Sequence, residues 1–386
     1  MTAEVEIAAG RAREVVRAAQ RLLTKRTGAP VVLVDPQDLG GSDRTVVLRV
    51  RPQANPFALP RTMVVKKVLA PGGEPNTDEA FVREVASYQF ANSLPLQHRP
   101  GATLVAYDVT ERLLVLDDLG GASTLAEVLL GADPAVAQRG LLAWAQALGR
   151  MHAATAGRED DYTTLLRRVG RRHLNTDPLA RAADTAVAEL PQAMEQVLGV
   201  DTSAEVAQRA TQSQRLLGRG SLRAFSPADL CPDNALLTAA GVQFLDFEWG
   251  GFRDVALDAA YALVPFPACW CSPPWDAAQG EAILQAWRAE VGGVWPQLDD
   301  DDVLHARVFD AQLLWVWLST HWFLPGRAAR RAPSSAHPLA LSASAALSQR
   351  WQRLSGAAES AGESATAAHA RLVATALEAT ALERTN

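Results

Sequence analysis

The stretch FSPADLCPDNALL, residues 225–237, places an acid and an amide five positions apart in an otherwise apolar segment: Asp229 and Asn234. The stretch QFLDFEWGG follows at residues 243–251 and carries a second acid, Asp246, between apolar neighbours. Burying a carboxylate or an amide without a partner costs free energy, so polar groups in such segments indicate a chemical role. We therefore take these three side chains as the first candidates for a functional site.

Composition sets broad limits on the class of protein. The chain of 386 residues is 48% hydrophobic and 21% charged, which is typical of a globular protein with one large or two moderate domains. A formal net charge of -6 argues against a nucleic-acid-binding surface, which favours basic residues. No run of about 18 apolar residues occurs, and the charged N-terminus is typical of an amphipathic helix rather than a signal peptide. We expect a cytoplasmic protein with neither membrane nor nucleic-acid partners.

Lysine and cysteine are both rare in this chain. The cysteines are Cys231, Cys269 and Cys271. They are too few for a disulfide framework, and a lone Cys-x-Cys is a weak indication of zinc. Besides Lys25, the only lysines are the adjacent Lys66 and Lys67 in the apolar run TMVVKKVLA. One reading places them on the solvent face of a strand, and the other gives one of them a role in a site.

The first third of the chain predicts an antiparallel sheet. Apolar or β-branched runs bounded by turn residues predict strands at 30–34, 44–50, 61–69, 102–109 and 112–118. The segment 76–95 between the third and fourth runs has helical periodicity and ends before Pro95. The short spacing of the first strands favours antiparallel pairing.

After residue 120 the pattern changes to helices, interrupted by two short strand-like pieces, NALLTA and VQFLDF. Seven of the ten tryptophans lie between residues 270 and 322. The predicted fold class is therefore α+β, with a small five-stranded lobe carrying one helix at 1–118 and a larger, mainly helical lobe at 119–386.

The polar residues singled out above match the requirements of phosphoryl transfer from ATP. Such a protein must hold Mg²⁺ on the phosphates, position a hydroxyl and neutralise charge on the transferred group. The hard Mg²⁺ ion prefers oxygen ligands, which an aspartate and an asparagine supply. The kinase template has a strand lysine with a helix glutamate, an aspartate with an asparagine five residues later, and a second aspartate after the next strand. Lys66, Glu84, Asp229, Asn234 and Asp246 occur in that order.

On these motifs the chain resembles the aminoglycoside phosphotransferase and choline kinase-like superfamily of small-molecule kinases, over roughly residues 30–265. DLCPDNALLTAAGVQFLDFEWGGFRDVALDAAYAL resembles the catalytic loop, the metal loop and the following helix of that family. LGRMHAAT resembles the helix ahead of the catalytic region, and RLLVLDDLGG the nucleotide hinge. FVREVASYQF resembles the lysine-pairing helix, and LGGSDRTVVLRV the loop over the phosphates. A protein-kinase-like two-lobed fold is what the resemblance implies.

The resemblance also implies a role for each residue that matches a family motif. Asp229 would orient the acceptor hydroxyl and accept its proton, and Asn234 and Asp246 would bind Mg²⁺. Lys66 would hold the α- and β-phosphates of ATP, with Glu84 as its ion-pair partner. The adenine would meet the backbone of Leu116, Asp117 and Asp118. The loop close to the phosphates would be that of Gly40, Gly41 and Ser42.

Several alternatives stand beside these roles. Lys67 is the neighbour of Lys66, but strand alternation would turn it to the opposite face. Glu79 competes with Glu84, and the acids of the catalytic and metal loops have a structural reading as turn residues. The acidic run LDDDDV, residues 298–303, is typical of a helix N-terminus and alternatively indicates an amine-bearing acceptor.

One position departs from the family pattern. The family usually carries a histidine two places before the catalytic aspartate, where this chain has Pro227. Proline fixes φ and would hold the loop by another route. The leading hypothesis is a phosphotransferase acting on a hydroxyl of a metabolite or antibiotic. The alternatives are a nucleotide-binding pseudokinase, which Pro227 favours, and a helical interaction protein, which predicts no nucleotide binding.

Overall fold

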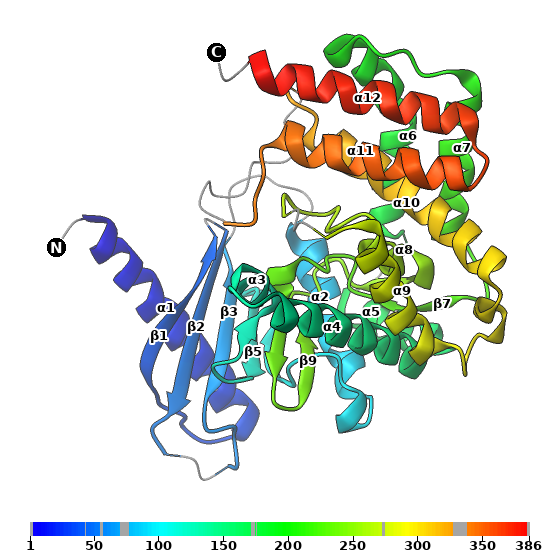
Figure 1. Ribbon diagram of the computed structural model, residues 1–386. Helices are drawn as coiled ribbons and strands as arrows, with labels where there is room; N and C mark the ends of the chain where they lie inside the picture. Colours follow the sequence, from blue (N-terminus) through cyan, green and yellow to red (C-terminus); the bar gives the residue numbers. More distant parts are fainter. Residues whose placement is uncertain are drawn as a thin grey trace. The chain divides into compact units, whose positions relative to one another are not determined.

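The chain forms two compact units, coloured along the sequence in Figure 1. The computed structural model describes residues 3–42, 44–54, 57–69, 77–170, 174, 176–271, 275–326 and 338–383. The first unit comprises Met1–Ala122, Asp160–Leu174 and Leu245–Gly250. The second comprises Ser123–Glu159, Asn175–Phe244 and Gly251–Asn386. Residues 245–250, which carry Asp246, thus belong to the first unit although the segments on either side belong to the second.

The first unit is built on an antiparallel five-stranded sheet in the order β1-β2-β3-β5-β4. Its strands are β1 (Leu33–Ser42), β2 (Thr45–Pro52), β3 (Met63–Val68), β4 (Leu104–Asp108) and β5 (Leu113–Asp117). Its helices are α1 (Ala3–Thr27), α2 (Thr77–Asn92) and, from Asp160 onward, α5 (Glu159–Gly170). With α2 inserted between the third and fourth strands and a mainly helical remainder, the predicted α+β fold class is confirmed.

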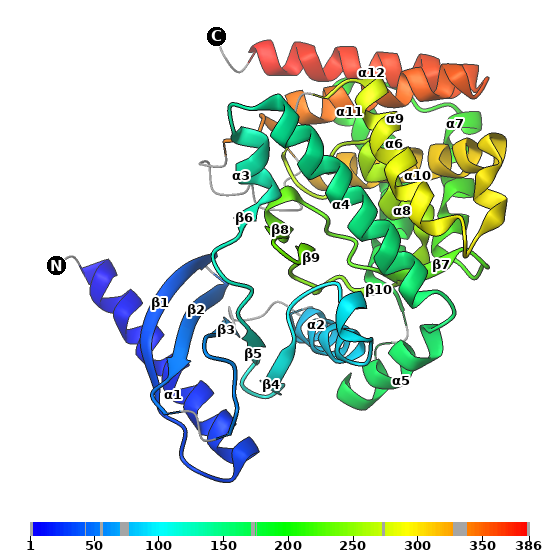
Figure 2. The same ribbon diagram turned by 60° about the horizontal axis from the view of Figure 1, so that its bottom comes forward.

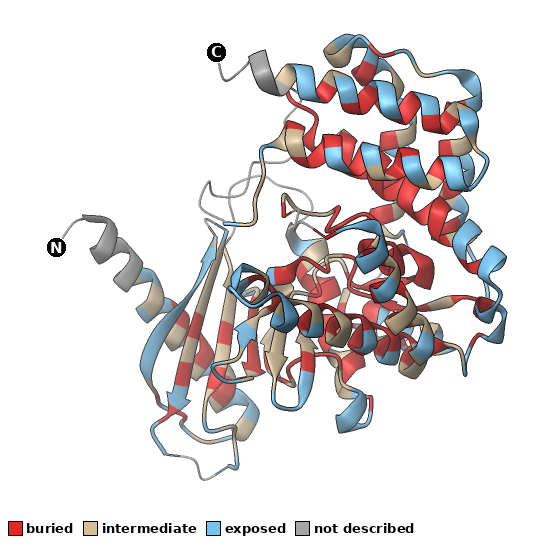
Figure 3. Ribbon diagram, in the orientation of Figure 1, coloured by how far each residue is buried: buried red, intermediate tan, exposed pale blue. Residues whose placement is uncertain are grey.

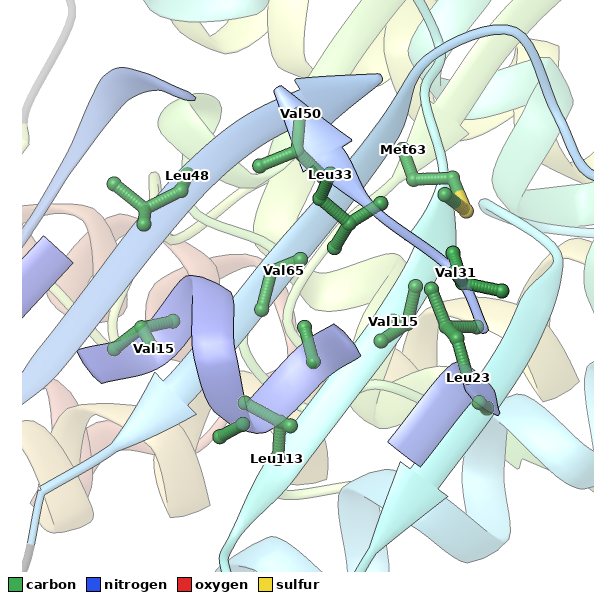
Figure 4. Close-up of a cluster of buried hydrophobic side chains, with 13 residues drawn as sticks. Val15, Leu23, Val31, Leu33, Leu48, Val50, Met63, Val65, Leu113 and Val115 are labelled. Carbon is green, nitrogen blue, oxygen red and sulfur yellow. The ribbon is translucent and has the colours of Figure 1, made fainter. Parts of the chain in front are cut away.

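Helix α1 covers one face of this sheet, and its apolar side chains form a single stripe. Its buried residues Val15, Ala18, Ala19 and Leu23 recur every three to four positions, as one face of a helix requires. Figure 4 shows Val15 and Leu23 against side chains from the sheet, including Val65 of β3. The sheet contributes alternate residues to this core, since successive side chains of a strand point to opposite faces. The remaining buried sheet residues and their neighbours in this cluster are Val31, Leu33, Leu48, Val50, Met63, Ala106, Leu113 and Val115.

Strand β1 is longer than the sequence predicts. The predicted strand ends at residue 34, whereas β1 continues through Pro36, Gly40 and Gly41 to Ser42. It pairs only with β2, so it is an edge strand, where a proline and irregular pairing are tolerated. The register shifts twice along it, at residues 34–37 and 38–41. The glycine-containing segment is therefore bulged edge-strand backbone and not an unpaired loop.

The second unit is mainly helical. Its helices are α3 (Leu125–Leu130), α4 (Pro134–Thr155), α6 (Pro178–Leu198), α7 (Ala204–Ser213), α8 (Val255–Ala259), α9 (Ala277–Val291), α10 (Asp301–Phe323), α11 (Ala343–Ser360) and α12 (Ser364–Glu383). Figure 3 shows α10 buried along most of its length, and it packs against α6, α7, α8 and α11. Its Trp315, Trp317 and Trp322 are core residues. Among the described residues, no helix combines the length and apolar character needed to cross a membrane.

The stretch FSPADLCPDNALL begins in one short sheet and ends in another. Strand β7 (Arg223–Ser226) pairs with β10 (Gly251–Asp254). Strand β8 (Ala235–Thr238) pairs with β9 (Gly241–Phe244) and with β6 (Ser123–Thr124). Asp229 and Asn234 lie in the connection between β7 and β8, the latter in the 3-10 helix η3 (Pro232–Asn234). The strands therefore fix the backbone on both sides of these residues. Figure 2 gives a second view of β8 and β9 beside α3 and α4.

Candidate active site

Lys66 makes two ion pairs at the centre of the first unit. It lies on the central strand β3, opposite Val47 of β2 and Leu114 of β5. Its Nζ donates to Glu84 Oε1 at 2.8 Å and to Asp246 Oδ1 at 2.8 Å. The adjacent Lys67 instead donates to Glu111 at 2.9 Å, as strand alternation predicts. The structure thus brings Lys66, Glu84 and Asp246 together.

The geometry of helix α2 determines that Glu84, and not Glu79, pairs with Lys66. Glu84 is buried, with its side chain 1% exposed, and faces Lys66. The competing Glu79, five residues earlier, accepts from Arg83 at 3.1 Å along the same helix. Residues five apart on a helix do not share a face, so only one of the two glutamates can reach the strand. That glutamate is Glu84.

The loop carrying Asp246 is held by the same helix. Asp246 adopts a positive φ of 58°, a conformation uncommon outside glycine. The Tyr88 hydroxyl is hydrogen-bonded to the backbone of Asp246, and the Tyr88 ring packs on Phe247 with centroids 4.8 Å apart. At the end of the loop, a Cβ on Gly250 would lie 2.1 Å from Ser87 Oγ. The loop therefore fits against α2 so closely that its backbone conformation is determined there.

The carboxylates of Glu84 and Asp246 share the single ammonium of Lys66, and the pKa values of Glu84 and Lys66 are both raised. Burial raises the pKa of Glu84 to about 7, although the Lys66 ammonium opposes this effect. Burial alone would lower the pKa of Lys66, but Asp246 and Glu84 together raise it well above its usual value. Lys66 is therefore charged at neutral pH, whereas Glu84 is close to its own midpoint.

In the second unit, Asp229 follows a residue with unusual backbone geometry. Ala228 has a φ of 61°, and its carbonyl accepts from the Tyr261 hydroxyl at 2.5 Å. Asp229 Oδ1 accepts from the backbone N–H of Cys231 at 3.3 Å, and the Asn234 side chain donates to the Asp229 carbonyl at 3.5 Å. These contacts connect the predicted base to the predicted metal ligand within one short loop.

A chain of buried hydrogen bonds holds this loop on both sides of Pro227. Ser226 donates to Asp258 Oδ1 at 2.8 Å, and its hydroxyl oxygen accepts from Ala228 N–H at 3.1 Å. Asp258 Oδ2 lies 3.1 Å from His152 Nε2. Trp287 Nε1–H donates to His152 Nδ1 at 3.0 Å, so Nδ1 is unprotonated and Nε2 carries the proton that Asp258 accepts. Ser226 thus connects the loop to the core from the position next to Pro227.

The predicted hinge and phosphate-loop residues are backbone elements of the first unit. Leu116 pairs with Val64, and Asp117 N–H donates to the Thr103 carbonyl at 2.8 Å. Asp118 forms an ion pair with Arg49 at 2.7 Å. Burial would raise the pKa of Asp118, but hydrogen bonds from Arg49, Gly120 N–H and Thr62 hold it below its usual value.

At the end of β1, Gly40 and Gly41 have positive φ values of 93° and 149°. A Cβ on Gly41 would lie 2.4 Å from the Thr45 carbonyl oxygen, so this position requires glycine. Ser42 closes the strand, and its side chain lies outside the described residues.

Each unit offers an oxygen donor of the kind that suits Mg²⁺. In the first unit, the Asp246 side chain is 38% exposed. In the second unit, the Asn234 side chain offers an amide oxygen, because its nitrogen donates to the Asp229 carbonyl. The Lys66 ammonium, which is charged at neutral pH, suits a phosphate anion.

Three residues that hold the loops of Asp229 and Asp246 could not be identified from the sequence. In the sequence, Tyr88 is indistinguishable from an apolar helix residue, Ser226 from the end of a strand, and Tyr261 from a residue of a core helix. Only their hydrogen bonds, across 33 residues for Tyr261 and Ala228, identify them.

The chain was compared with known proteins. No protein-family model and no curated protein matches it. Among solved structures, it is similar to choline kinase from Cryptosporidium parvum, with a TM-score of 0.49 and 11% identity, over 93% of this chain and 97% of that chain. It is also similar to a choline/ethanolamine kinase family protein from Mesorhizobium loti, with a TM-score of 0.47 and 15% identity, over 88% and 93% of the two chains. The third is an aminoglycoside-3'-phosphotransferase of type VIII, with a TM-score of 0.40 and 21% identity, over 79% and 99%.

These names fall within the aminoglycoside phosphotransferase and choline kinase-like group that the sequence motifs resemble.

Proposed function

We propose that the chain is an ATP- and Mg²⁺-dependent phosphotransferase that transfers the γ-phosphate to a hydroxyl of a small molecule. The acceptor is a metabolite, or an aminoglycoside or other antibiotic, and the composition supports a cytoplasmic location. The observation that carries this proposal is the Lys66 ammonium, 2.8 Å from both Glu84 and Asp246. In phosphoryl transfer, such a lysine pairs with phosphate oxygens, and such an aspartate holds the metal.

In this proposal Asp229 orients the acceptor hydroxyl and accepts its proton as the hydroxyl oxygen attacks the γ-phosphorus of ATP. The bond from that phosphorus to the β,γ-bridging oxygen breaks, and ADP leaves with the electron pair. Lys66, positioned by Glu84, binds the α- and β-phosphates. Asn234 and Asp246 hold Mg²⁺, which when bound neutralises charge on the phosphate oxygens.

The remaining nucleotide contacts are proposed for backbone groups. Those of Leu116, Asp117 and Asp118 would bind the adenine, a contact that requires no particular side chain. Those of Gly40, Gly41 and Ser42 would approach the phosphates, where a side chain at Gly41 would be excluded by the Thr45 carbonyl.

The test combines binding and turnover. Thermal unfolding with MgATP is expected to show nucleotide-dependent stabilisation, and mass spectrometry of a hydroxyl-compound library is expected to show MgATP-dependent addition of one phosphate. Asp229→Asn is expected to keep the stabilisation and to lower turnover by at least about a hundredfold, since general-base catalysis contributes roughly that much. Absence of any MgATP effect on the wild-type protein would contradict the proposal.

A pseudokinase is the second candidate, because Pro227 replaces the family histidine. It predicts MgATP-dependent stabilisation with no phosphorylated product from any compound in the library. The Ser226 and Asp258 hydrogen bond supports the active enzyme, since it holds the loop in the absence of that histidine.

A further inference from the structure

Helix α11 carries a buried arginine whose charge has no counterion among the described residues. Arg350 is 1% exposed. Its Nη2 donates to two backbone carbonyls, those of Phe266 at 2.9 Å and Cys269 at 2.5 Å. Within the part of the chain that the structure describes, Nε and Nη1 have no hydrogen-bond partner. A buried guanidinium normally has all its donors paired, most often with a carboxylate.

The described groups around Arg350 do not supply the missing negative charge. The titratable groups whose charge would act on it include Cys269 and Tyr261. Burial raises the pKa values of both well above their usual ranges, so these two groups are neutral at physiological pH. Burial also lowers the pKa of Arg350 itself, the direction expected for a charge without a counterion.

Between Arg350 and the predicted catalytic base, Asp229, lies one small group of residues: Tyr261, Cys231 and Cys269. The Tyr261 hydroxyl donates to the Ala228 carbonyl at 2.5 Å, directly before Asp229. The Cys231 thiol is hydrogen-bonded to the Asp229 side chain and to the Cys269 thiol, whose own carbonyl accepts from Arg350. The unpaired guanidinium and Asp229 therefore lie on two sides of the same small group of residues.

Two further buried donors lie in or beside the segment 264–271, which contains Phe266 and Cys269. Trp144 of α4 packs its ring edge-on against Phe266 with centroids 6.2 Å apart. The indole N–H groups of Trp144 and Trp270 have no partner among the described residues. Phe266 adopts a φ of 47°, and strained backbone of this kind gathers at binding sites. Cys269 and Trp270 are only half-buried, so the segment reaches the surface. Among the described residues, these unpaired groups are donors, and an acceptor-rich ligand would satisfy them.

We infer that Arg350 binds an anionic group of the acceptor, so that the acceptor is an alcohol carrying a carboxylate or a phosphate ester. This inference rests on the proposed phosphotransferase function and specifies its substrate class. The acidic run at residues 298–303 favours an amine-bearing acceptor as the alternative. In the structure Asp300 caps α10 and Asp301 pairs with Arg288 at 2.5 Å, so these two acids serve the helix N-terminus.

Anion binding is tested first without nucleotide. Thermal unfolding and calorimetry of the full chain with sodium phosphate and sodium glycerate, against sodium chloride at equal ionic strength, are expected to show stabilisation by the two oxyanions. Arg350→Met is expected to weaken this binding by about tenfold to a hundredfold, as loss of charge-assisted hydrogen bonds does. Its melting temperature without anion is expected to stay the same or rise, because an uncompensated buried charge has been removed.

Arg353→Met is the matched control, because Arg353 lies one turn further along α11 and donates to the Trp275 carbonyl instead. It is expected to leave anion binding within about twofold of wild type. Arg350→Lys keeps the charge, is expected to retain part of the binding, and serves in place of Arg350→Met if that variant does not fold. No oxyanion effect on the wild-type protein, or equal binding by wild type and the Arg350 variants, would overturn the inference.

Turnover separates this inference from the proposed function. With MgATP, hydroxy acids are expected to be phosphorylated with at least tenfold higher kcat/KM than amino alcohols of the same length. Stabilisation by MgATP with a preference for amino alcohols would refute the anionic acceptor and leave the phosphotransferase intact. Oxyanion binding through Arg350 without any MgATP effect would refute the phosphotransferase and leave the anion site.

Discussion

Replacing Glu84 by glutamine is expected to change how the stability of the protein depends on pH. Glu84 is buried, with 1% of its side chain exposed, and its pKa is raised from 4.5 to about 7, mainly by burial. Between these two values the folded protein holds a proton that the unfolded chain has lost. Folding is then linked to proton uptake, so the contribution of Glu84 to stability falls as the pH rises.

The size of the effect follows from the pKa values. Moving a pKa from 4.5 to about 7 corresponds to about 3 kcal/mol, at 1.36 kcal/mol for each tenfold change in proton affinity. Glutamine does not titrate, and it keeps an oxygen that accepts from Lys66. The free energy of unfolding of wild type, minus that of Glu84→Gln, is therefore expected to decrease by about 3 kcal/mol as the pH rises from about 4.5 to 8.

Urea unfolding followed by circular dichroism at several pH values measures this difference. Glu79→Gln serves as the control on the same helix, because it removes an i,i+4 pair with Arg83, and a pair of this kind contributes about 0.5 kcal/mol. A difference between wild type and Glu84→Gln that is constant, or that increases with pH, would refute the reasoning. An increase would mean that the Lys66 ion pair outweighs burial and lowers the pKa of Glu84.

Three further substitutions test other parts of the site. Lys66→Met is expected to weaken MgATP binding by at least about tenfold in calorimetry, since the ammonium that would pair with the phosphates is lost; unchanged affinity would exclude that role. Ser226→Ala leaves buried Asp258 without one of its donors, and is expected to cost about 1–3 kcal/mol of unfolding free energy and to lower kcat more than the KM for ATP. Equal kcat in wild type and Ser226→Ala would show that the loop does not need this hydrogen bond. Gly250→Ala brings a Cβ to 2.1 Å from Ser87 Oγ and is expected to cost about 1–3 kcal/mol, part of which Ser87→Gly should restore. Lack of rescue would place the strain on the backbone instead.

The features predicted correctly from the sequence are those that local periodicity determines. The five strands, the inserted helix and the amphipathic N-terminal helix all follow from hydrophobic spacing. The same spacing distinguishes Lys66 from Lys67, because adjacent strand residues point to opposite faces. The ion pair with Glu84, which the structure contains at 2.8 Å, is predicted by the resemblance to the kinase motif and not by spacing. The roles of these residues in nucleotide binding stay predictions.

What the sequence did not reveal depends on which segments pair with each other and not on the spacing within one segment. The length of β1 depends on β2, which pairs with bulged backbone that reads as a loop in isolation. In the sequence, Arg350 is indistinguishable from an ordinary polar residue of a helix. Its buried hydrogen bonds are with carbonyls 81 and 84 residues away, and no local pattern predicts them. Such pairings have no local pattern, since they depend on how the helices of the second unit pack together.

The departure at Pro227 has a structural explanation in the residues around it. Proline has no N–H, so it adds no unpaired donor to a buried loop. Ser226 supplies the connection to Asp258, and the same hydroxyl accepts from the N–H of Ala228. The Ala228 carbonyl accepts from Tyr261, and the Ser226 carbonyl accepts from Arg253 at 3.2 Å. These backbone groups ahead of Asp229 are paired, so a proline at position 227 is compatible with an ordered loop.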